Sequence, residues 1–173
     1  MQTETNLLRP ASRRAFMTTT RQSVLCYTTT ISVEKTVAEI SALLAVAKTT
    51  AILSEFTGGI CTAISFRINT EFGLLTFRLP ANIDAVYVIL QRSRLIPPRL
   101  RTKEQAARVA WRIILHWLDA QLAMIQSGLV LTEQVFLPYC QDSTGTTLFE
   151  RFRRSRYSTC LLERNPASGE AAS

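Results

Sequence analysis

Metal-ligating and catalytic residues are scarce in this sequence. It contains one histidine, His116, and four cysteines, none of which form a C-x-x-C motif. A structural zinc site needs four closely grouped cysteine or histidine ligands, so no zinc site is predicted. The Walker and G-x-G-x-x-G phosphate loops, the G-x-S-x-G turn of hydrolases and the H-E-x-x-H helix of metalloproteases are also missing. We therefore expect no metal, no cofactor and a protein that is not an enzyme.

Long uninterrupted apolar runs are missing as well. The most apolar stretch, 105–125, is interrupted by four polar side chains: Arg108, Arg112, His116 and Asp119. A membrane-spanning helix needs about 20 apolar residues, so none is expected and no membrane partner is predicted. The sequence has no secretory signal, and its scattered cysteines are interpreted as free thiols of a reducing compartment. We expect a cytoplasmic protein.

Charge is limited, and hydrophobic content is high enough for a folded core. Hydrophobic residues make up 47% of the 173 residues, and charged residues only 19%. This composition is typical of a globular chain, and its length fits one domain. We predict a single domain over 27–152, a flexible basic N-terminal extension over 1–26, and a basic, largely disordered tail over 153–173.

Four segments have the composition and alternation of strands. Tyr27–Val33 places Tyr27, Thr29, Ile31 and Val33 on one face at a period of two, which predicts a first strand. Strands are also predicted over 51–56, 60–68 and 74–79, with Gly58-Gly59 as the tight turn of the first hairpin. In the strand 60–68 we expect Ile64 and Phe66 to face the core and Cys61 the opposite side. The last three strands should form an antiparallel meander.

Helical spacing predicts the remaining elements. A helix is expected over 33–47, a short one over 83–92, and the longest over 103–127, where Thr102 and Gln105 form a capping box. The predicted fold is a two-layer α+β domain of order β-α-β-β-β-α-α, in which a four-stranded, mostly antiparallel sheet is covered by a long C-terminal helix. Trp111 and Trp117 should lie on the core-facing side of that helix.

Positive charge is concentrated outside the predicted elements. The net charge is +7, and the connector 92–101 and the C-terminal stretch 151–156 together hold eight arginines and no acids. Such segments attract phosphate, and the aromatic residues Phe152 and Tyr157 beside them could stack on bases. The predicted nucleic-acid contacts are Arg67, Arg78, Arg92, Arg94, Arg99, Arg101, Arg151, Arg153, Arg154 and Arg156.

A second interpretation is a protein-binding module, an inhibitor or adaptor of another protein. Arg108, Arg112, His116 and Asp119 recur at i, i+4, i+8 and i+11 of the long helix and therefore share one face. This polar stripe, or a free edge of the sheet, could bind a host or phage protein. An ordinary solvated helix face would show the same pattern.

Two longer stretches carry a family resemblance. They are YTTTISVEKTVAEISALLA, with the following GG hairpin and FRLP, and TKEQAARVAWRIILHWLDAQLAMIQSG, with VFLPY after it. Over about 27–152 the chain resembles a group of small uncharacterised proteins of bacteria and their phages or prophages. The resemblance implies a bacterial or phage origin, a cytoplasmic setting, and a role in nucleic-acid metabolism or in interference with a host protein. It assigns no role to any residue.

Overall fold

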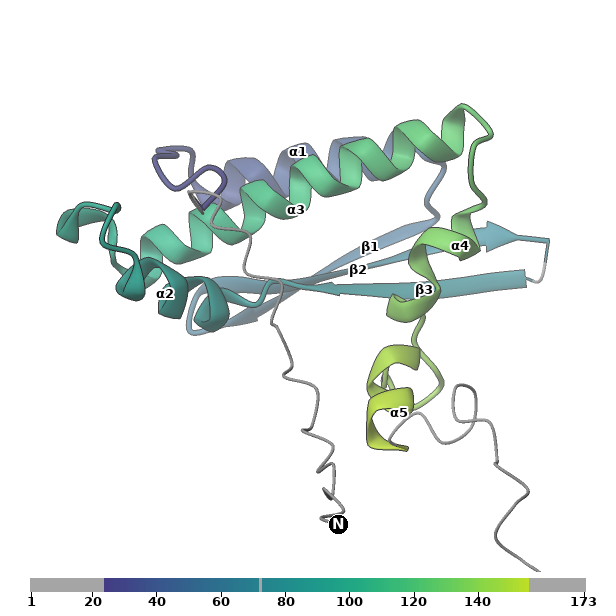
Figure 1. The fold of residues 1–173 in the computed structure, drawn as a ribbon. Helices are drawn as coiled ribbons and strands as arrows, with labels where there is room; N and C mark the ends of the chain where they lie inside the picture. Colours follow the sequence, from purple (N-terminus) through teal and green to yellow (C-terminus); the bar gives the residue numbers. More distant parts are fainter. Residues whose placement is uncertain (1–23, 72, 156–173) are drawn as a thin grey trace, which may run out of the picture.

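The computed structural model describes residues 24–71 and 73–155, and these form a mixed α+β domain (Figure 1). Residues 1–23 of the predicted extension (1–26) and residues 156–173 of the predicted tail (153–173), Arg156 included, lie outside the described residues. The elements in chain order are α1 (Val33–Val46), β1 (Ala51–Thr57), β2 (Ile60–Thr70), β3 (Gly73–Pro80), α2 (Ile83–Arg92), η1 (Pro98–Leu100), α3 (Lys103–Gln126), α4 (Thr132–Phe136), η2 (Leu137–Tyr139) and α5 (Leu148–Arg154). No helix among the described residues is long and apolar enough to cross a bilayer.

The sheet is an antiparallel meander of three strands in the order β1-β2-β3. Its first hairpin turns at Gly58 and Gly59, both of which have positive φ (57° and 79°), the backbone region that favours glycine. A bulge at Thr62 interrupts the β1–β2 register, because Glu55 pairs with Ala63 and Phe56 pairs with Cys61. The bulge shifts the side-chain alternation, so Cys61 joins Ile64 in the core instead of facing the opposite side as predicted.

The predicted first strand over 27–33 is wrong, and the sheet therefore has three strands instead of four. Residues 25–28 form a turn, and no strand pairing includes residues 24–32. A side chain takes the place of strand pairing: the Gln105 Nε2 donates to the carbonyl oxygens of Tyr27 (2.8 Å) and Thr29 (2.9 Å). Tyr27 packs against a small cluster beside α2. The alternating pattern thus falls on a turn and an irregular segment that border the helices.

One helical layer, made by α1 and α3, covers one face of the sheet (Figure 1). Trp111 is fully buried, as predicted, and its Nε1 donates to the Cys61 carbonyl (2.9 Å) beside the bulge. Trp117 is half-buried and meets Phe136 edge-on. The core consists of Ile40, Leu44, Cys61, Ile64, Phe66, Phe77, Leu79, Ala81, Ala110, Trp111, Leu115, Leu118, Leu122 and Phe136.

A second, smaller cluster supports the end of the molecule that carries α2. Leu90, Ile96 and Ala106 are buried together there, which anchors the connector between α2 and α3. The capping box predicted at Thr102 is present in part, since the Thr102 hydroxyl accepts from the Gln105 backbone N–H (3.1 Å). The connector is therefore fixed at both ends by packed helices.

The chain after α3 covers the outer edge of β3. Cys140 forms an isolated antiparallel bridge with Phe77, and the Gln141 N–H donates to the Thr76 carbonyl (2.8 Å). The segment then ends in α5, which lies on the side of the sheet opposite to α1 and α3 (Figure 1). α5 includes residues on both sides of the predicted domain boundary at 152.

Candidate nucleic-acid interface

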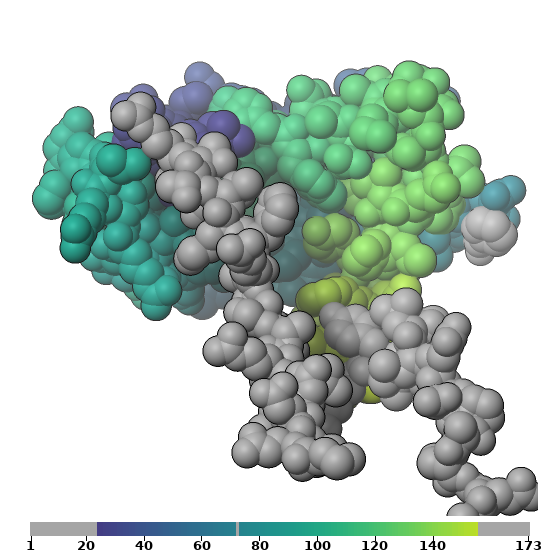
Figure 2. Space-filling view, viewed as in Figure 1, coloured from purple at the N-terminus to yellow at the C-terminus, as the bar shows by residue number. Residues whose placement is uncertain are grey.

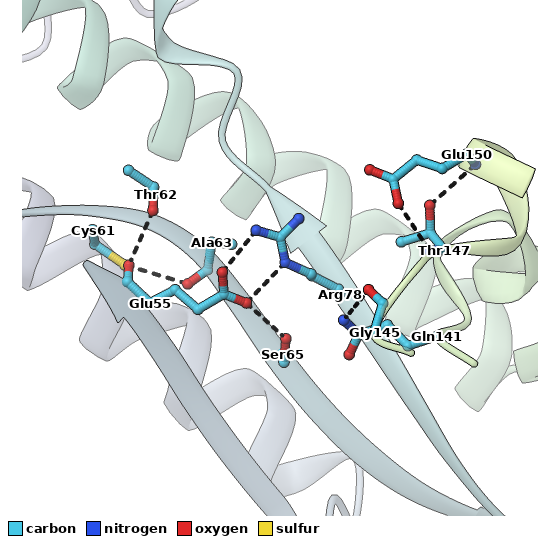
Figure 3. Close-up of polar contacts among 10 residues, drawn as sticks. All are labelled: Glu55, Cys61, Thr62, Ala63, Ser65, Arg78, Gln141, Gly145, Thr147 and Glu150. Carbon is cyan, nitrogen blue, oxygen red and sulfur yellow. Dashed lines mark hydrogen bonds and ion pairs between the residues drawn. The ribbon is translucent and has the colours of Figure 1, made fainter. Parts of the chain in front are cut away.

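The face of the sheet opposite to α1 and α3 contains an ion pair. Arg78, which was predicted to be a free cation on this face, is one of its two members. Arg78 on β3 donates to the Glu55 carboxylate on β1 through Nε (2.8 Å) and Nη2 (2.7 Å), and the Ser65 hydroxyl between them donates to the same carboxylate (3.4 Å) (Figure 3). The Arg78 hydrogen bonds hold the pKa of Glu55 below its usual range. Arg78 was predicted to contact nucleic acid, but its charge is compensated by a bidentate partner.

Arg67 lies farther along the same face and is exposed. It borders a shallow groove of about 450 Å³ that also contacts Leu53, Glu55 and Gln141. The Gln141 side chain is bound within its own turn, because its Nε2 donates to the Gly145 carbonyl (3.0 Å) (Figure 3). The sheet face thus offers one exposed arginine beside a neutralised one.

The C-terminal arginines within the described residues lie on α5. This helix begins with a capping box, in which the Thr147 hydroxyl accepts from the Glu150 N–H (3.2 Å) and the Glu150 carboxylate accepts from the Thr147 N–H (2.9 Å) (Figure 3). The backbone hydrogen bond lowers the pKa of Glu150. Arg151 forms an ion pair with Asp142 (3.7 Å), whereas Arg153 and Arg154 are exposed. The arginines of this helix therefore lie beside two acids, Glu150 and Asp142.

The connector between α2 and α3 carries four arginines and no acids over 92–101. Within the part of the chain that the structure describes, Arg92, Arg94 and Arg99 are exposed and form no ion pair with an acid. The fourth arginine, Arg101, is half-buried, and its Nε donates to the Ile96 carbonyl (2.9 Å). Figure 2 shows this end of the molecule as the teal surface at the left.

Hydrogen bonds hold the connector in a defined conformation. The Gln91 Nε2 donates to the Arg101 carbonyl (2.7 Å), which joins the end of α2 to the start of α3. Pro97 and Pro98 lead into the short helix η1, and Ile96 is buried beneath it. Leu95 is 63% exposed between two of the basic positions. The connector therefore presents arginines and an apolar side chain on a fixed loop.

The polar stripe of α3 is divided between two surroundings. Arg112 is half-buried and forms an ion pair with Glu39 of α1. His116 and Asp119 are exposed, and with Arg112 they border a groove of about 490 Å³ between α1 and α3. Arg108 lies outside this groove and donates to the Gln105 side chain (3.2 Å). The structure thus brings together three of the four stripe residues.

Cys61 and His116, the cysteine and histidine of the folded elements, lie in different surroundings. Cys61 is 2% exposed in the core, and burial raises the pKa of its thiol. His116 is exposed in the groove between the helices, so the two side chains do not form a nucleophile–base pair. No group of three or more metal-ligating side chains comes together within residues 24–71 and 73–155.

Two important polar residues were not identified from the sequence. Gln105 was recognised only as part of a helix cap, although its buried side chain binds the segment before α1. Glu55 was not recognised at all, because its pairing with Arg78 depends on the register of three strands. The sequence offers one signal for this role of Gln105: it is a polar residue on the side of α3 that faces the core.

Comparisons with protein-family models, curated proteins and solved structures find no match to this chain.

Proposed function

We propose that this protein is a non-enzymatic nucleic-acid-binding protein whose main contact is the basic connector between α2 and α3. The observation that carries the proposal is the exposure of Arg92 at the end of α2, and of Arg94 and Arg99 after it, without acidic partners among the described residues. Arginines in this situation keep their full charge for phosphate groups.

The contrast with the other predicted contacts supports the connector. Arg78 is bound to Glu55, and Arg151 is paired with Asp142, so a phosphate would have to compete with a carboxylate at both positions. Arg67, Arg153 and Arg154 are exposed and would serve as secondary contacts. Binding at these secondary positions would not require breaking an ion pair either, but among the described residues only the connector groups three such arginines.

The chemistry of this contact favours binding that depends little on sequence. Arginines on a loop neutralise backbone phosphates, and such contacts carry no base information. The exposed Leu95 beside them could contact a sugar or an unstacked base, as in single-stranded nucleic acid. We also propose that the protein acts in the cytoplasm as an accessory protein of the phage or prophage type. This part of the proposal rests on the resemblance described from the sequence.

The test compares three double variants that each remove two positive charges. Arg94→Ala/Arg99→Ala changes the connector, and Arg153→Ala/Arg154→Ala changes α5. The control, Lys35→Ala/Lys48→Gly, changes the α1 side. Lys48 is replaced by glycine because its φ is positive (60°). Binding to single- and double-stranded DNA and RNA is measured by fluorescence anisotropy from about 50 mM salt upward.

The connector variant should weaken binding similarly for all sequences and reduce the slope of log affinity against log salt by roughly 1.4–1.8, or 0.7–0.9 for each lost phosphate contact. The control should bind as the unchanged protein does. Equal losses in all three variants would mean that only net charge matters. An intact protein that binds no nucleic acid at low salt would refute the proposal.

A second candidate function is binding of another protein in the groove between α1 and α3. The supporting observation is the combination of apolar and polar side chains there: Val46 is 72% exposed, and Arg112, His116 and Asp119 border the same groove. If nucleic acid does not bind, His116→Ala/Asp119→Ala should reduce capture of a bacterial protein, and Arg94→Ala/Arg99→Ala should not.

A further inference from the structure

The two edges of the sheet differ in a way that points to an interaction surface. The edge of β3 is covered near its middle by the bridge between Phe77 and Cys140. The edge of β1 has no pairing partner among residues 24–71 and 73–155. A free edge strand presents unpaired backbone N–H and C=O groups, which makes it a template for another strand.

β1 also has few of the features that protect edge strands from association. Its sequence, AILSEFT, contains no lysine and no proline, and its single charge, Glu55, is bound to Arg78 of the same chain. The bulge opposite Glu55 lies in β2, within the sheet, so it leaves the outer edge of β1 open.

The helical layer leaves the apolar side chains of β1 partly uncovered. α1 packs over β2, and Phe56, which shares the helix-facing side with its partner Cys61, remains 63% exposed. Ile52 lies on the same side four residues earlier and is half-buried. These two side chains form an apolar strip at the edge of the core.

We propose that β1 pairs antiparallel with β1 of a second copy of this chain, around a twofold axis at Ser54, to form a continuous six-stranded sheet. This inference is independent of nucleic-acid binding. The register places Ile52 opposite Phe56 of the other copy, twice, and brings Ser54 opposite itself. Glu55 falls opposite Leu53, so the carboxylates of the two copies do not face each other. Cross-strand apolar pairs of this kind stabilise antiparallel sheets.

The charge distribution selects a second copy as the partner. The chain has a net charge of +7, but residues 27–80 contain four basic and four acidic side chains. Two such segments carry no net charge, so they can approach through β1 without net repulsion between them. An antiparallel edge strand is also self-complementary, because a twofold axis gives each copy the same donors and acceptors.

The experiment uses a charge pair at the proposed axis. The full chain is treated with nuclease and washed at about 0.5 M salt to remove nucleic acid, and is then measured at about 0.1 M salt by light scattering and sedimentation over a dilution series. The unchanged protein should have twice the mass of one chain. Ser54→Lys and Ser54→Glu should each be folded monomers, because like charges face each other, and an equal mixture of the two should form dimers again.

Phe56→Lys and Leu74→Lys provide a matched comparison of exposed apolar residues on the two outer strands. Phe56→Lys should shift the protein to monomer, whereas Leu74→Lys on β3, which is 54% exposed, should leave the dimer intact. Circular dichroism and thermal unfolding establish that each variant is folded. A monomeric unchanged protein, or a dimer that survives both Ser54→Lys and Phe56→Lys, would overturn the proposal, as would a mixture of the charge variants that stays monomeric.

Discussion

The two tryptophans of α3 allow one feature of the core to be tested on its own. Trp111 is fully buried and donates a hydrogen bond from Nε1 to the Cys61 carbonyl (2.9 Å), whereas Trp117 is half-buried and makes ring contacts with Phe136 and Tyr139. They are the only tryptophans in the chain. Changing either one to phenylalanine keeps a ring at the position and leaves a single tryptophan as a spectroscopic probe.

The expected costs differ because only Trp111→Phe leaves a buried acceptor without its donor. A net hydrogen bond contributes about 1 kcal/mol, and leaving the Cys61 carbonyl unsatisfied costs roughly 1–3 kcal/mol, with a further loss from the smaller ring. We expect Trp111→Phe to lower the free energy of unfolding by about 2–4 kcal/mol. Trp117→Phe keeps its aromatic contacts, and its cost should be about 1 kcal/mol or less.

Urea denaturation followed by circular dichroism measures both costs, and fluorescence gives an independent check. In Trp117→Phe the remaining Trp111 should emit at short wavelength and resist quenching by iodide. In Trp111→Phe the remaining Trp117 should emit at longer wavelength and be quenched more readily. Equal destabilisation by the two changes, together with equal quenching, would show that the assignment of the faces of α3 is incorrect.

Three further predictions concern single polar or glycine positions. Folding lowers the pKa of Glu55, so the stability that its carboxylate contributes is complete above the ordinary carboxyl pKa and is lost as the pH falls through the folded-state pKa. Glu55→Gln should therefore make the free energy of unfolding fall less steeply below about pH 5. An unchanged slope in denaturation experiments would contradict this. Gln105→Leu should cost about 2 kcal/mol, for two hydrogen bonds, and should speed hydrogen exchange over 27–31; exchange that is unchanged there would refute the anchoring role. Gly59→Ala should cost about 1 kcal/mol in thermal unfolding, because only backbone strain opposes a Cβ at this site, and Gly59→Asn should cost less.

The meander and the long helix could be predicted because their signals are local. Gly58-Gly59 fixes the first hairpin, and Thr102 with Gln105 marks the start of α3. The first strand could not be judged in the same way. Its alternation predicts a strand, but residues 25–28 form a turn, and whether a segment joins a sheet depends on partners far along the chain. Here the partner is Gln105, 78 residues after Tyr27.

The candidate interface was predictable only in part for the same reason. Composition locates the arginines, but it does not show which of them have acidic neighbours in space. Arg78 lies 23 residues after Glu55, and their contact depends on the register of the intervening strand and on its bulge. The exposed state of Arg92, Arg94 and Arg99 agrees with their place between helices, where few acids occur in the sequence.

The position of α3 in the chain has a consequence for synthesis on the ribosome. α1 and all three strands are complete at residue 80, but the helix that buries the middle of their shared face begins at Lys103 and ends at Gln126. Until that helix leaves the exit tunnel, the nascent chain exposes Ile64, Phe66 and Phe77 together with an unpaired strand edge. Such surfaces favour aggregation and recruit chaperones. Chains arrested before residue 103 should therefore accumulate as chaperone-bound or insoluble species. Chains long enough for residue 141 to have left the tunnel, so that the β3 edge is also covered, should fold.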